Sequence, residues 1–118
     1  MALTLEKKTQ GSATVITCRG AVIYGTESDQ LREYVKEALG SAPMVVLDLA
    51  NVTYVDSGGL GAIVGLYSSA RAAGGDFKVA RANERVRHVF RITKLMHVLE
   101  NYDTVEAAVA ALSSHAAA

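Results

Sequence analysis

The segment at residues 56–61 combines an acid, a hydroxyl and three glycines, and it is the part of this sequence best suited to chemistry. It reads Asp56-Ser57-Gly58-Gly59-Leu60-Gly61 and lies just before a predicted helix. A helix start exposes unpaired backbone N–H groups and a partial positive charge, so a phosphoryl group on Ser57 would be stabilised there. Because glycines lack a Cβ, the backbone of another protein could approach closely at these positions.

Two known phosphate-binding and nucleophile motifs do not fit this segment. No Gly-Lys-Ser/Thr follows the glycines, which excludes a phosphate-binding P-loop. Tyr54-Val55-Asp56 precedes Ser57, which excludes the Gly-x-Ser-x-Gly nucleophile elbow. No set of base, nucleophile and orienting group is recognisable, so no enzymatic activity, catalytic residue or cofactor is predicted. The simplest structural alternative is that Ser57 only caps the helix and the glycines only form a turn.

The histidines and the single cysteine do not form a reactive or metal-binding set. His88, His97 and His115 share no ligand spacing, so no metal site is predicted. Cys18 lies in an alternating, strand-like segment with no activating group nearby, which favours a small core residue over a nucleophile. A lone cysteine also excludes an internal disulfide.

Basic residues concentrate between positions 78 and 94, where Glu84 is the one acid that offsets them. They are Lys78, Arg81, Arg85, Arg87, Arg91 and Lys94, half of the chain's positive charge. The favoured interpretation is a solvated helix face. The alternative is a docking surface for an acidic partner or a phosphorylated group.

Length and composition limit the class of protein further. The 118 residues suit one domain, and half of them are apolar, which is typical of a globular chain. Twelve basic and twelve acidic residues give a net charge of zero, which argues against direct nucleic-acid binding as the main function. The N-terminus has no apolar signal core and no run reaches membrane-spanning length, so we expect a cytoplasmic protein without membrane insertion.

The chain begins with a predicted hairpin followed by a helix. Residues 3–7 and 13–18 alternate in polarity around a turn at Gly11. Gly20 is expected to close the second strand. Thr26 is a suitable N-cap for a helix that ends at Gly40.

The remaining sequence alternates strands with helices and predicts an α/β fold with the order β-β-α-β-α-β-α-β-α. The first expected elements are a strand at 44–49 leading on through 52–55, and a second long helix with Ser57 at its N-terminus, an apolar face from Leu60 and an end at Gly74-Gly75. They are followed by a strand at 76–80, a helix capped by Asn83, a weak strand at 96–99, and a helix from the capping segment 103–106 to Leu112. A single domain over 1–112 and a frayed tail over 113–118 complete the prediction.

Three segments carry a resemblance to a known family, the STAS domains, and within it to bacterial anti-sigma-factor antagonists. They are Val45-Val46-Leu47-Asp48-Leu49, the run Val52 to Gly61, and Gly74-Gly75-Asp76-Phe77-Lys78-Val79. The resemblance extends over nearly the whole chain. It implies a mixed sheet of four to five strands with helices mainly on one face.

The resemblance also implies a mechanism. Ser57 matches the serine that an anti-sigma-factor serine kinase phosphorylates with its own ATP and Mg²⁺, and Asp56 matches the acid before it. The unphosphorylated antagonist binds that kinase and releases a sigma factor to regulate transcription, and a phosphatase resets the switch. The implied partner surface comprises Asp56, Ser57, Gly58, Gly59, Leu60 and Gly61.

Two departures from the family pattern stand near this segment. Gly58 occupies a position that is usually Ser or Thr, and Ile23 occupies one that is often acidic. The absent acid favours a divergent kinase partner. An alternative function within the family is a STAS subunit that grips the ATPase of an ABC-type lipid-transport complex.

Overall fold

A computed structural model describes residues 3–117, with the side chains described as far as Leu112. Over residues 3–117 the chain forms five strands and four helices in the predicted order. The elements are β1 (Thr4–Gln10), β2 (Ala13–Val22), α1 (Thr26–Ser41), β3 (Met44–Val55), α2 (Ser57–Ala72), β4 (Asp76–Ala80), α3 (Glu84–Ile92), β5 (Asn101–Tyr102) and α4 (Val105–Ala117).

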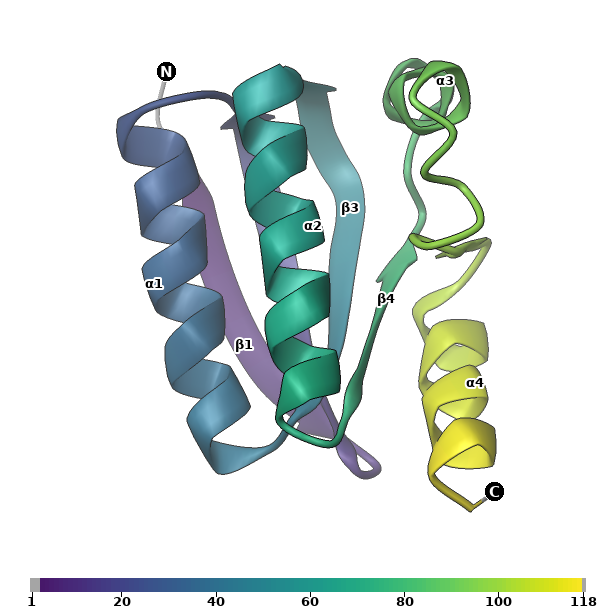
Figure 1. The fold of residues 1–118 in the computed structure, drawn as a ribbon. Coiled ribbons are helices and arrows are strands. Elements are labelled where there is room, and N and C mark those ends of the chain that lie inside the picture. The colour runs from purple at the N-terminus through teal and green to yellow at the C-terminus, as the bar shows by residue number, and fades with distance from the viewer. Residues whose placement is uncertain (1–2, 118) are drawn as a thin grey trace.

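The strands form one mixed sheet in the order β1-β2-β3-β4-β5 (Figure 1). β1 pairs antiparallel with β2 through a turn in which Gly11 adopts φ 62°, which confirms the predicted hairpin. The pairs β2–β3, β3–β4 and β4–β5 are parallel. Because parallel strands end at a common edge, the chain that leaves β2 meets the chain that leaves β3.

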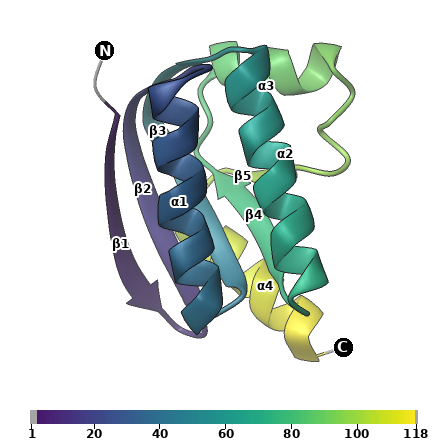
Figure 2. The same ribbon diagram turned by 60° about the vertical axis from the view of Figure 1, so that its left-hand side comes forward.

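Helices cover the sheet unequally, and α1 and α2 lie side by side on one face (Figure 2). The apolar residues of α3, Val86 and Phe90, join the core on that side, so three helices contribute to it. α4 packs on the other face against a smaller core that includes Val46, Ala80 and Leu112. The predicted arrangement with helices mainly on one face is therefore confirmed.

Several predicted boundaries at β2 and at the first helix are wrong. The N-cap of α1 is Gly25 rather than Thr26, and no side-chain cap hydrogen bond forms there. β2 continues past Gly20 to Val22, because its parallel pairing with β3 continues to Val22. Gly20 marks an irregularity within the strand, where it adopts φ 114° and the pairing register shifts. α1 also passes through Gly40 to Ser41.

The C-terminal part differs from its prediction mainly in the last strand. Residues 96–99 form a turn, in which the Leu99 N–H donates to the Leu95 carbonyl at 2.7 Å while the Leu99 side chain is buried. The prediction of a strand at 96–99 is wrong, and the last strand is β5, at Asn101–Tyr102. The predicted cap Asn83 is confirmed, since its side chain accepts from the N–H of Val86. The predicted capping segment 103–106 is confirmed as well, and within it Thr104 accepts from the N–H of Ala107. Fraying of 113–118 stays a prediction, because those side chains and Ala118 lie outside the described residues.

Within residues 3–117, none of the helices combines the length and apolarity that crossing a membrane requires. The same residues bring no three His, Cys, Asp or Glu side chains together as a possible metal site. The side chain of His115 is not among those described.

The Cys18 thiol lies fully buried in the larger core. Burial, and secondarily the negative charge of Asp48, raise the pKa of Cys18 to about 12. We therefore expect the folded protein not to react with a thiol-specific disulfide reagent at pH 8, and the urea-unfolded protein to react with one equivalent. Rapid stoichiometric reaction of the folded protein would contradict this placement.

The same pKa shift gives a pH dependence of stability. A thiol whose pKa is higher in the folded than in the unfolded state stabilises the fold below the unfolded value of 9.0 and loses that contribution as the pH rises toward 12. Denaturant titrations should show the free energy of unfolding falling above pH 9, with at most about 1.4 kcal/mol per pH unit due to this group. Cys18→Ala should remove that part of the slope, and an unchanged slope would contradict the assignment.

Candidate functional site

Asp56 is the N-cap of α2. Its Oδ1 accepts the Gly59 N–H at 2.7 Å, and its own N–H donates to the Val22 carbonyl at 3.2 Å. Ser57 is the first residue of the helix, and it is exposed. The prediction that Ser57 begins the second long helix is confirmed, and the alternative that Ser57 is the cap is wrong.

The Ser57 hydroxyl is unengaged. Among the described residues, it has no hydrogen-bond partner within the chain. Since Asp56 supplies the cap, the hydroxyl contributes nothing to the local hydrogen-bond network. It is therefore available to another molecule at the positive end of α2.

The carboxylate of Asp56 also holds the segment that follows β2. The Tyr24 N–H donates to both Oδ1 and Oδ2 of Asp56 at 3.1 Å. One side chain thus connects the end of β2 to the start of α2. Sequence reasoning missed Tyr24, because no local motif marks a residue whose partner lies 32 positions later.

The glycines of this segment serve close contacts within the chain. A Cβ on Gly59 would lie 2.0 Å from the Val22 carbonyl oxygen, and one on Gly58 would lie 2.5 Å from the Tyr24 Cβ. A Cβ on Gly61 would meet nothing within 4 Å, and Gly61 is exposed. The argument that another backbone could approach a glycine here therefore applies to Gly61.

The six residues of the predicted partner surface differ in exposure. Ser57 and Gly61 are exposed, Asp56 and Gly58 are partly buried, and Gly59 and Leu60 are buried. Gly59 and Leu60 therefore pack the helix onto the sheet and offer little surface to a partner. Contact of a partner with any of the six stays a prediction.

The backbone of Ile23 is fixed next to this site. Its carbonyl accepts from the Ser28 N–H at 3.1 Å and from the Ser28 hydroxyl at 2.5 Å. The buried Ser28 hydroxyl is thereby satisfied, and the segment is attached to the first turn of α1. Ile23 itself is partly buried.

Acidic residues distant in sequence offset much of the basic charge at 78–94. Arg81 forms two hydrogen bonds with the buried Asp48, at 2.6 and 3.0 Å. Lys78 binds Glu100 at 2.9 Å. Although burial acts to lower the pKa of Lys78, the hydrogen bond that its ammonium donates to Glu100 and the nearby acidic charge raise that pKa overall. The expectation that Glu84 alone offsets these cations is therefore wrong.

The exposed arginines of α3 are engaged as well. Arg87 and Arg91 both bind Glu84, at 2.9 and 2.6 Å, and the hydrogen bond from Arg91 lowers the pKa of Glu84. Arg85 lies over the ring of Tyr54, 5.2 Å from its centroid. These contacts favour the interpretation of a solvated helix face.

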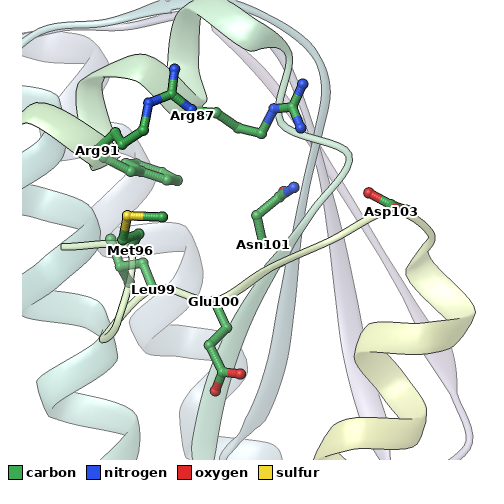
Figure 3. A pocket seen from close by; sticks show the side chains of 8 residues that line it. Arg87, Arg91, Met96, Leu99, Glu100, Asn101 and Asp103 are labelled. Atoms are coloured by element: carbon green, nitrogen blue, oxygen red, sulfur yellow. The ribbon is translucent and has the colours of Figure 1, made fainter. Parts of the chain in front are cut away.

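A hollow of about 350 Å³ lies between α3 and the segment around β5 (Figure 3). Arg87 and Arg91 lie on one side of it, and Asn101 and Asp103 lie on the other. The Glu100 side chain turns away from the arginines (Figure 3) and binds Lys78. None of residues 56–61 lines this hollow, and its mixed charges favour no one class of ligand.

Gly59 and Gly61 provide a matched test of the packing at α2. Gly59→Ala would place a methyl group against the Val22 backbone, so it should lower the free energy of unfolding by about 1–3 kcal/mol or more. The methyl group of Gly61→Ala would lie in open space, so this substitution should raise the free energy of unfolding by up to about 1 kcal/mol, because alanine favours the helix more than glycine does. Chemical denaturation measures both, and equal effects would contradict the close contact at Gly59.

The chain is similar to known proteins of one domain family. The profile of the STAS domain matches residues 4–108. The anti-sigma F factor antagonist of Paenibacillus polymyxa is 29% identical over 105 residues, which cover 87% of this chain and 89% of the relative. A Thermotoga neapolitana protein named as a homologue of an anti-sigma factor antagonist is 38% identical over 65 residues, or 55% of this chain. That match spans little more than half of the relative, 58% of its length.

Solved structures agree with the sequence comparisons. The phosphorylated form of the Bacillus cell fate determinant SpoIIAA superimposes with a TM-score of 0.69 at 22% identity, over 92% of this chain and 96% of the other. At 22% identity, the similarity between the two structures shows a shared fold and nothing more specific. The domain profile covers most of the chain, and the observed sheet and helices match it, so this chain belongs to the STAS domain family.

Proposed function

We propose that this chain is an anti-sigma-factor antagonist, a protein-binding switch without catalysis of its own, and that Ser57 is its phosphoacceptor. The observation that carries the proposal is the free, exposed hydroxyl of Ser57 at the start of α2, beside a cap that Asp56 already supplies. The naming of relatives such as the anti-sigma F factor antagonist supports it.

The proposed partner is an anti-sigma-factor serine kinase that brings ATP and Mg²⁺. Unphosphorylated antagonist binds the kinase and a sigma factor is released to act in transcription. A phosphatase acting on phosphorylated Ser57 restores the binding form. The switch works in the cytoplasm and needs no cofactor, nucleic acid or membrane insertion.

Phosphorylation at Ser57 is compatible with the folded chain. Phosphate adds about −1.5 to −2 charges at pH 7, and the N-terminal field of a helix stabilises a negative charge by roughly 0.3–1 kcal/mol. The adjacent Asp56 carboxylate is itself held by the N–H groups of Gly59 and Tyr24, which offset part of its charge. Release of the partner must therefore arise at the interface, where an unpaired charge is costly to bury.

Substitutions at Ser57 test the switch. Ser57→Ala should keep kinase binding and abolish phosphorylation, while Ser57→Glu should weaken binding by tenfold or more, equivalent to about 1.4 kcal/mol or more. Both variants should remain folded, because the hydroxyl has no structural partner. Incubation of the chain with each candidate kinase and ATP, followed by peptide mapping and binding titration, measures these effects.

The result also separates the two functions within the family. Phosphate found at another residue, or equal kinase affinity of the Ala and Glu variants, would remove Ser57 from the switch. The alternative of a STAS subunit in an ABC-type lipid-transport complex would then be favoured. Genes for a permease and an ATPase beside this one would point the same way.

Ile23 tests the choice of kinase. A kinase that recognises an acid at this position should bind the present chain weakly, because an apolar side chain offers nothing to a basic or metal-bearing surface. Ile23→Asp should then strengthen binding to the anti-sigma-B factor of Bacillus subtilis, whose antagonist is a relative of this chain. Tight binding of the unchanged protein, with no effect of the substitution, would show that the departure is unimportant.

A further inference from the structure

We propose that Tyr24 is an anchor of the kinase-binding surface and determines which kinase the chain accepts. The inference rests on the proposed function, because the occupant of this surface is the kinase that phosphorylates Ser57. Tyr24 contacts the same helix start as Ser57, through Asp56 and Gly58. Its side chain is not part of the core.

Tyr24 is 81% exposed, the largest value among the described large hydrophobic residues. The other exposed ones are Tyr54 at 40%, Ile92 at 64% and Met96 at 47%. A tyrosine contributes a large, stiff contact area and a hydroxyl that can form a hydrogen bond, which is why tyrosine is enriched among residues that dominate binding energy. Tyr24 has this character and lies beside the proposed phosphoacceptor.

The backbone beneath the exposed ring is held in place. The Tyr24 N–H is bound by the Asp56 carboxylate, and the Ile23 carbonyl accepts two hydrogen bonds from Ser28. Only the two side-chain torsions of Tyr24 remain to be ordered when a partner binds. A preorganised anchor of this kind costs little conformational entropy on association.

The observed position of Tyr24 requires a glycine at residue 58. A Cβ at residue 58 would lie 2.5 Å from the Tyr24 Cβ and 2.9 Å from its Cα. A serine or threonine at position 58, as is usual in the family, would therefore force the Tyr24 segment outward. The glycine at 58 and the Ile23-Tyr24 segment form one structural unit, so the two departures from the family pattern are coupled.

This unit fits a partner of particular chemistry. An acid at position 23 would call for a cationic or metal-bearing contact, but this chain has the apolar Ile23 there, followed by the exposed ring of Tyr24 with a phenol at its tip. The matching kinase surface is an apolar recess with one hydrogen-bonding group at its end. Truncation of the ring should then weaken kinase binding more than loss of the phenol alone.

The binding test uses the kinase from the source genome that phosphorylates Ser57. Tyr24→Ala should weaken binding of the unphosphorylated chain by tenfold or more, while Tyr24→Phe stays within about threefold. Ile92→Ala, which truncates another exposed apolar side chain on α3, is the matched control and should leave the affinity unchanged. A Tyr24→Ala affinity within twofold of the unsubstituted protein would overturn the inference while leaving Ser57 as the phosphoacceptor.

A second test has two readouts, and the first of them, an amide resonance, needs no partner. Gly58→Ser should shift the backbone amide resonance of Tyr24 in the folded protein, and should weaken kinase binding as Tyr24→Ala does. Gly61→Ser, in open space one helical turn on, should leave the Tyr24 resonance unchanged. An unshifted Tyr24 amide in Gly58→Ser would overturn the coupling, and a survey in which no kinase acts on Ser57 would overturn this inference together with the proposed function.

Discussion

The Asp56 carboxylate is the interaction on which the rest of this site depends. It caps α2 through Gly59 and holds the segment after β2 through Tyr24. The two partners come from regions more than thirty residues apart, and they meet because β2 and β3 are parallel neighbours whose ends share one edge of the sheet. By taking the capping role, Asp56 leaves the neighbouring Ser57 hydroxyl free.

Close packing around this carboxylate explains the run of glycines. Gly59 brings the first turn of α2 against the Val22 carbonyl, and Gly58 brings it against Tyr24. Both contacts are too short for a Cβ. The glycines therefore belong mainly to the internal junction between β2 and α2, and the surface left for a partner is formed by exposed side chains around it.

Two ion pairs also join residues that are distant along the chain. The buried Asp48 on β3 binds Arg81, which follows β4 and adopts φ 60°, and Glu100 binds Lys78 on β4. Glu84 binds two arginines of its own helix. A stretch that looks strongly basic in sequence is thus partly neutralised in the folded protein, and this argues against an electrostatic docking surface there.

The sequence by itself determined the alternation of strands and helices, the turn at Gly11, the cap at Asn83, the capping segment 103–106, and the position of Ser57 at the start of a helix. These depend on periodicity and on contacts between near neighbours, which a local pattern records. It did not determine the last strand, because a segment of two residues carries no period and its pairing with β4 is set by tertiary packing. Only the tertiary structure decided that Asp56 rather than Ser57 is the cap, that Tyr24 lies over Gly58, and that Asp48 meets Arg81. The last two results join residues that are adjacent in the fold and distant along the chain, so no local pattern could contain them. The cap spans only three residues, but Asp56 and Ser57 are both good capping residues, and the local sequence did not choose between them.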